Sequence, residues 1–119
     1  SNSATIVPTA DGPLCAACLA GDEEEARRLA AEADGSTAYA ASKLALARFV
    51  RRNAPRPDWA GAGVRLNAIA PGAALTPLLQ EGLDDPLLGQ AIRGFPIPLG
   101  GFAAPDQIAA AIAFLLGPA

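Results

Sequence analysis

The chain has 119 residues, a net charge of −3, and a composition that is 51% hydrophobic and only 18% charged. This apolar share excludes an intrinsically disordered chain, and the length excludes more than one domain. The acidic balance, without a cluster of basic residues, argues against nucleic acid as the main partner.

Neither a targeting segment nor a membrane span is visible in the sequence. The first residues lack the basic stretch and the long apolar core of a signal peptide. The most apolar run, residues 108–116, is far shorter than the roughly 20 residues that cross a bilayer. We therefore expect a cytoplasmic protein without a membrane partner.

Two short helices are predicted near the amino terminus. Residues 14–20 are apolar and helical in character. Asp22 suits the N-cap of the next helix, because the carboxylates at positions 23–25 favour the positive end of the helix dipole. Asp34 and Gly35 end that helix. The acidic run is thus interpreted as a helix start with a solvated face.

Cys15 and Cys18 have the Cys-x-x-Cys spacing of redox motifs and of half a zinc site. The chain has no histidine and no third cysteine, so it cannot complete a thiolate–imidazole zinc site. No clear strand precedes the pair, as a thioredoxin-like motif requires. We interpret both as small buried thiols on a helix and expect no metal.

A longer helix, capped by Ser36 or Thr37, is predicted to run to about Arg52 and carries Tyr39 and Lys43. Residues four apart share one face of a helix, so the phenol and the ammonium can lie together. A nearby positive charge favours the ionised phenol, which makes this a candidate acid–base pair. The alternative is an exposed tyrosine beside a solvated lysine. The wide apolar arc of this helix predicts burial against a sheet and a partner subunit.

Residues 63–70 are the one strand that the sequence predicts, and their apolar pattern suits an interior parallel strand. Pro71 and Gly72 end it. A lone strand leaves its backbone groups unpaired on both edges. The order of helix, strand and helix therefore predicts an α/β fold, with residues 1–119 forming one partial domain whose other strands are missing.

The stretch 73–104 is rich in leucine yet cut by proline and glycine. It is a candidate lid over an apolar site, and a loop packed on its own core is the alternative. Pro105 and Asp106 then open a last helix that runs through Leu116, because proline and an acidic residue both favour the first turn of a helix.

Three ordered motifs resemble the short-chain dehydrogenase/reductase family. They are Tyr-Ala-Ala-Ser-Lys at 39–43, Val-Arg-Leu-Asn-Ala-Ile-Ala-Pro-Gly at 64–72 followed by Thr76, and the helix that begins at Pro105. The resemblance covers the chain from Tyr39 onward. It implies the carboxyl-terminal portion of a Rossmann-like doubly wound parallel sheet, without the amino-terminal half and the last strand.

Residues 12–35 resemble a helical insertion of one subgroup, the members similar to bacterial 3α-hydroxysteroid dehydrogenase/carbonyl reductase, and residues 78–86 resemble the same subgroup. Family members carry a catalytic serine shortly before the tyrosine, where this chain has no suitable hydroxyl. Reading back through the insertion places Ser1 closest to that serine, with Ser3 as the alternative.

The resemblance implies the chemistry of three side chains. Tyr39 would exchange a proton with the oxygen of a carbonyl or alcohol, and Lys43 would favour its ionised form and hold the nicotinamide ribose. The hydroxyl of Ser1 would orient the substrate oxygen. Such positioned donors neutralise the charge that develops on oxygen during the reaction.

The resemblance also implies where the cofactor, NAD or NADP, is held. Pro71 and Gly72, with Ile69, would line the nicotinamide, and Thr76 would bond its carboxamide or phosphate. The subgroup favours NAD. The glycines at 61 and 63 precede a strand, the wrong order for a nucleotide fingerprint, so we expect this chain alone to be inactive.

The sequence thus predicts an NAD(P)-dependent oxidoreductase that interconverts a carbonyl and a secondary alcohol. The substrate would be small and apolar, such as a hydroxysteroid or xenobiotic carbonyl compound, and the protein would form a homodimer or homotetramer. One rival is a truncated, non-catalytic interaction module that acts through the helix of Tyr39. A second is a thiol redox protein that uses Cys15 and Cys18.

Overall fold

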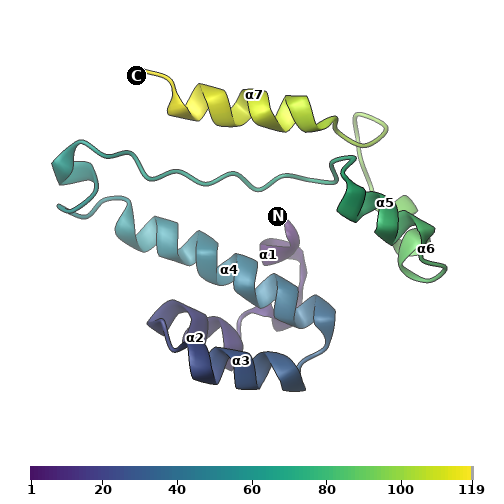
Figure 1. The fold of residues 1–119 in the computed structure, drawn as a ribbon, viewed down its shortest axis with the longest axis horizontal. Coiled ribbons are helices and arrows are strands. Elements are labelled where there is room, and N and C mark those ends of the chain that lie inside the picture. The colour runs from purple at the N-terminus through teal and green to yellow at the C-terminus, as the bar shows by residue number, and fades with distance from the viewer. Residues whose placement is uncertain (119) are drawn as a thin grey trace. The chain divides into compact units, whose positions relative to one another are not determined.

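The structure, a computed structural model, describes residues 1–118, and its regular elements are helices apart from one isolated bridge (Figure 1). The chain divides into two compact units, Ser1 to Ala70 and Pro71 onward. Each unit is described by itself. That the chain is one partial domain stays a prediction.

The first unit is built around the long helix α4. Its elements are α1 (Ser3–Ile6), the 3-10 helix η1 (Pro8–Ala10), α2 (Pro13–Ala20), α3 (Glu23–Glu32), α4 (Gly35–Asn53) and the 3-10 helix η2 (Ala60–Ala62). Helices α1, η1 and α2 all pack against α4, and α3 packs against α2. The helices predicted over 14–20, after Asp22 and around Tyr39 are confirmed.

The core of this unit consists of small and apolar side chains from α2 and α4. Leu14 and Cys15 of α2 are buried against Ala41 and Ala45 of α4. Alanines at the contact let the two helices approach closely, and Ala26, Leu29 and Ala30 of α3 pack against the same cluster. The two helices α2 and α3 thus occupy the stretch 12–35, whose role as an insertion stays a prediction.

The predicted N-cap of α3 is confirmed, since the Asp22 carboxylate accepts a hydrogen bond from the Glu25 backbone N–H at 3.1 Å. The acidic run beyond it lies on a solvated face and pairs with arginines one turn away. The pairs are Arg27 with Glu23 at 2.6 Å, and Arg28 with Glu25 and with Glu32 at 2.7 Å. Such exposed pairs stabilise the helix only slightly.

The predicted cap of α4 was wrong: Asp34, and neither Ser36 nor Thr37, is the N-cap. Its carboxylate accepts hydrogen bonds from the backbone N–H groups of Ser36 and Thr37, both at 3.0 Å. The preceding helix ends at Glu32 with Ala33 as its C-cap, before the expected end at Asp34 and Gly35, which leaves Asp34 in extended conformation and able to cap. Hydrogen bonds from Thr37 and then Ser36 lower the pKa of Asp34 to about 2.

The start of α4 is therefore expected to respond to acid. Because the pKa of Asp34 is lowered from 3.8 to about 2 in the folded state, its contribution is complete above pH 4 and is lost as the pH falls toward 2. Asp34→Asn keeps an N-cap without the charge. Its loss of melting temperature relative to the unsubstituted chain should be largest at pH 5 and shrink at pH 2, and an equal loss at both values would contradict this.

The strand predicted over 63–70 is not formed among the described residues, where 64–70 run as an extended segment without a sheet partner (Figure 1). A strand is stabilised by hydrogen bonds to its neighbours, and residues 1–118 contain no neighbouring strand. The predicted parallel sheet is likewise absent from the described part. Its one trace is an isolated parallel bridge between Ala74 and Ala103.

The second unit contains α5 (Pro77–Asp84), α6 (Leu88–Arg93) and α7 (Pro105–Leu116). The bridge joins both ends of the stretch 73–104: the N–H of Leu75 donates to the Ala103 carbonyl at 2.8 Å, and the N–H of Ala103 donates to the Ala73 carbonyl at 3.0 Å. This stretch is thus a closed loop that carries the α5–α6 pair. Its role as a substrate lid stays a prediction.

Helices α5 and α6 meet at two glycines. A Cβ added to Gly89 would lie 2.4 Å from the Leu83 carbonyl oxygen, so only glycine allows this approach. A Cβ added to Gly82 would lie 2.8 Å from Cδ1 of Ile92. Arg93 also donates from Nη2 to the Leu83 carbonyl at 2.8 Å. The two helices therefore form one tightly joined hairpin.

The predicted last helix is confirmed as α7, where the Gln107 side chain accepts a hydrogen bond from the Ala104 N–H at 2.8 Å. None of its side chains is buried, although it is strongly apolar, and Phe114 and Leu116 are 82% and 78% exposed. No helix within residues 1–118 is long and apolar enough to span a membrane.

Candidate functional site

Tyr39 and Lys43 lie on the same face of α4, as their spacing predicts. The Lys43 ammonium nitrogen is 5.2 Å from the centre of the Tyr39 ring, a distance at which a cation is attracted to an aromatic face. Tyr39 is 47% exposed and Lys43 is half-buried, so both polar ends are accessible. On the opposite side of the helix, Ala40, Ala41 and Ala45 are buried and fix its orientation.

The candidate serine lies at the start of the first unit. The hydroxyl oxygens of Ser1 and Ser3 are 2.7 Å apart, and the Ser3 backbone N–H donates to the Ser1 oxygen at 3.2 Å. Helix α1, which begins at Ser3, packs against α4. The structure thus brings both serines and the helix of Tyr39 into one unit, and both hydroxyls stay candidates.

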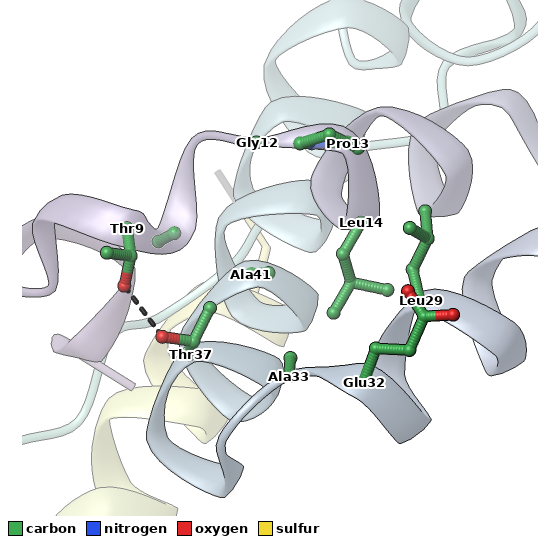
Figure 2. Close-up of a pocket in the computed structure, with 10 residues that line it drawn as sticks. Thr9, Gly12, Pro13, Leu14, Leu29, Glu32, Ala33, Thr37 and Ala41 are labelled. Atoms are coloured by element: carbon green, nitrogen blue, oxygen red, sulfur yellow. Dashed lines mark hydrogen bonds between the residues drawn. The ribbon is translucent and has the colours of Figure 1, made fainter.

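Two polar contacts between the amino-terminal segment and α4 were missed by the sequence analysis. Arg48 donates from Nη1 and Nη2 to the two carboxylate oxygens of Asp11, at 2.6 Å each. The hydroxyl oxygens of Thr9 and Thr37 lie 2.7 Å apart (Figure 2). The partners are 37 and 28 residues apart in the chain, so no local pattern reveals them.

A shallow groove lies beside the Thr9–Thr37 contact and is lined by residues of η1, α2, α3 and α4 (Figure 2). Its lining is mainly apolar and includes Leu14, Leu29 and Ala41, with Glu32 at the edge. The Glu32 carboxylate is already paired with Arg28. The groove therefore offers no unpartnered charge for a substrate and is not the candidate site.

The second unit carries three of the residues predicted to contact the cofactor, Pro71, Gly72 and Thr76, whereas Tyr39, Lys43 and Ile69 belong to the first unit. Thr76 is the N-cap of α5, and its hydroxyl oxygen accepts a hydrogen bond from the Leu79 N–H at 3.3 Å, so its own O–H is left to donate. Gly72 is exposed, and no heavy atom lies within 4 Å of a Cβ added there. Pro71 before it is half-buried. An open turn followed by a hydroxyl donor suits a carboxamide or phosphate oxygen.

The thiols show no reactive geometry. Both cysteines are free; Cys15 is buried and Cys18 is half-buried on α2. Burial raises the pKa of the Cys15 thiol and so disfavours the nucleophilic thiolate. Within residues 1–118 no three His, Cys, Asp or Glu side chains are grouped so as to hold a metal ion. These observations favour the interpretation of the pair as packing thiols.

Comparison with known proteins identifies the family. A family model described as "Enoyl-(Acyl carrier protein) reductase" matches residues 25–119. The chain is 40% identical over 79 residues to an "Uncharacterized short-chain type dehydrogenase/reductase" of Sinorhizobium fredii. The chain belongs to the short-chain dehydrogenase/reductase family, and the resemblance expected from residues 39–43 and 64–72 is confirmed.

Two of the similar proteins belong to one subgroup of this family, the 3-alpha-hydroxysteroid dehydrogenases. The chain is 51% identical over 110 residues to the 3-alpha-hydroxysteroid dehydrogenase/carbonyl reductase of Comamonas testosteroni, a match over 90% of this chain and 42% of that protein. It superposes with a TM-score of 0.91 on the crystal structure of the 3-alpha-hydroxysteroid dehydrogenase from Pseudomonas sp. B-0831 complexed with NADH, at 49% identity, covering 99% of this chain and 46% of that one.

The chain therefore spans less than half the length of these relatives. The portion that it matches explains why the predicted strand has no neighbour here: in a doubly wound fold, a strand pairs with strands contributed by both halves of the sheet. The predicted subgroup is confirmed by the two relatives.

Proposed function

We propose that this chain is the catalytic portion of an NAD(P)-dependent oxidoreductase that interconverts a carbonyl and a secondary alcohol. The observation that carries the proposal is the accessible Tyr39–Lys43 pair on one face of α4 in a chain 51% identical to a hydroxysteroid dehydrogenase/carbonyl reductase. A 3α-hydroxysteroid is the preferred substrate class, since both relatives named above are 3-alpha-hydroxysteroid dehydrogenases.

Each candidate side chain has one task. Tyr39 Oη gives a proton to the carbonyl oxygen in reduction and takes it from the alcohol in oxidation. Lys43 Nζ lies over the Tyr39 ring and places a positive charge beside the reacting side chain. The serine hydroxyl, from Ser1 or Ser3, donates a hydrogen bond to the same substrate oxygen and so fixes its direction.

The residues of each unit, taken separately, suit part of a nicotinamide cofactor. In the first unit Lys43 would hold the ribose hydroxyls. In the second, Pro71 and the open backbone at Gly72 would line the ring, and the O–H of Thr76 would donate to the carboxamide or a phosphate. The cofactor supplies or accepts the hydride when bound. NAD is preferred over NADP because the structural relative is complexed with NADH.

The interaction-module rival predicts that the chain folds by itself into a monodisperse species that binds a partner through α4. The exposed α7 argues against such autonomy, because an apolar helix without a single buried side chain needs a covering surface. A cytoplasmic location and a homo-oligomeric state stay predictions.

The proposal is tested in a completed enzyme, made by joining residues 1–119 in register to the parts of the Comamonas testosteroni relative that lie outside the match. We expect NAD-dependent oxidation of a 3α-hydroxysteroid, followed as NADH absorbance. The chain alone should bind no dinucleotide, measured by calorimetry. A folded completed enzyme that neither oxidises secondary alcohols nor reduces carbonyl compounds would refute the proposal.

A further inference from the structure

Arg48 and Asp11 form an ion pair with two parallel hydrogen bonds between segment 9–11 and α4. Both guanidinium Nη atoms donate to the two oxygens of one carboxylate, at 2.6 Å each, which fixes direction as well as distance. The hydrogen bond from Arg48 lowers the pKa of Asp11, so the pair stays ionised at neutral pH. The two side chains are 33% and 64% exposed, and pairs so exposed contribute little to stability.

A second contact joins the same segment to α4 on the other side of the candidate pair. The Thr9 and Thr37 hydroxyl oxygens lie 2.7 Å apart (Figure 2), and Ala10, between Thr9 and the next contact residue, is only 1% exposed. Thr37 precedes Tyr39 by two residues. The segment 9–11 therefore meets α4 at two points, with an apolar contact between them.

These two points are well separated along α4. They lie eleven residues apart, which at 1.5 Å per residue is about 16 Å of helix axis. The packing of α1 and α2 already holds α4 in place, and the two polar contacts add directional bonds at two points of the same segment. Tyr39 and Lys43 lie between these points in the chain.

We infer that Thr9, Asp11, Thr37 and Arg48 form a two-point clamp that holds segment 9–11 in register with the helix of Tyr39, and with it the adjoining helix α1, at whose start Ser1 and Ser3 lie. The inference rests on the proposed function for its catalytic meaning. The clamp residues touch no substrate and are positioning residues: they act through the serine hydroxyl, whose direction toward the substrate oxygen depends on this register. Small displacements of such a group are costly to the reaction.

The clamp is tested in the completed enzyme with Arg48→Met. We expect kcat to fall about 10- to 100-fold, as for misplacement of a catalytic group, while the KM for the nicotinamide cofactor stays unchanged. Arg48→Lys keeps the charge but loses the paired hydrogen bonds. Its kcat should lie between that of Arg48→Met and that of the unsubstituted enzyme. Exchanging the partners, Asp11→Arg with Arg48→Asp, should restore most of the rate.

A double-mutant cycle separates positioning from a merely structural role. The double variant Arg48→Met with Ser1→Ala should have the same kcat as Ser1→Ala alone, because the clamp acts through that hydroxyl. Ser3→Ala is tested in the same way. The matched control is Glu23→Gln, which breaks an ion pair of the same 2.6 Å length inside α3 and should leave kcat unchanged.

Three results would overturn the clamp. The first is an unchanged kcat in Arg48→Met, and the second is an equal loss of kcat in Glu23→Gln. The third is a loss of kcat from Arg48→Met that adds in full to the loss from Ser1→Ala and to that from Ser3→Ala. If the completed enzyme has no carbonyl or alcohol activity, the proposed function fails separately. The clamp is then judged by amide hydrogen exchange, which should quicken over residues 3–10 in Arg48→Met and Arg48→Lys but not in α3. Unchanged exchange over residues 3–10 would overturn it.

Discussion

Replacing Tyr39 by phenylalanine is expected to lower the kcat/KM of the completed enzyme by about 10²–10⁴-fold, the usual contribution of a positioned general acid. The substitution removes one oxygen and leaves the ring, which keeps its contact with the Lys43 ammonium. The loss should appear in both directions of the reaction, because the same oxygen gives and takes the proton. Initial rates of NADH formation and consumption measure it.

The fold should survive this change, since Tyr39 is 47% exposed and the core side of α4 consists of alanines. Far-ultraviolet circular dichroism and the melting temperature serve as checks. Cys15→Ala and Cys18→Ala are the matched controls and should keep nearly full activity. Activity that depends on the thiols and not on Tyr39 would favour a thiol redox protein and contradict the proposed function.

Replacing Gly89 by alanine is expected to destabilise the α5–α6 hairpin by about 1–3 kcal/mol, the cost of forcing an extra carbon into a packed contact. The new Cβ would meet the Leu83 carbonyl oxygen at 2.4 Å and Nη1 of Arg93 at 2.9 Å. The arginine can swing away, but the Leu83 oxygen belongs to the backbone of α5. The two helices must therefore separate.

This effect is measured as faster amide exchange over residues 77–93 and, if the hairpin covers the substrate, as a raised KM for the steroid with the KM for NAD unchanged. Gly94→Ala is the matched control, because a Cβ there would have only ordinary contacts, the nearest at 3.4 Å from the Gln90 carbonyl oxygen. Equal exchange in the two variants would show that the α5–α6 contact is looser than the structure indicates.

Local signals in the sequence were enough to predict several helices and the placement of Tyr39 and Lys43 on one helix face. The N-cap at Asp22 and the four-residue spacing of Tyr39 and Lys43 each act within about one turn, so neighbouring residues determine them. The same applies to α7, which begins at Pro105 as expected.

Features that depend on distant residues were predicted poorly or missed. The strand at 63–70 had the right pattern, but a strand forms only beside a neighbouring strand, and residues 63–70 take part in no strand pairing within residues 1–118. The Asp11–Arg48 contact joins positions 37 residues apart, and the cap at Asp34 depended on where α3 ended. These outcomes follow from tertiary context, which a single sequence does not display.

The exposure of α7 has a consequence for how long the polypeptide would survive in a cell while this helix is uncovered. A helix of twelve residues with no buried side chain is marginal in water, because packing supplies most of the stability of so short a helix. Its backbone would open often enough for proteases to reach it, and Phe114 would attract chaperones. A surface that covers α7 would protect it from both, so resistance of the protein to proteolysis would indicate that α7 is covered.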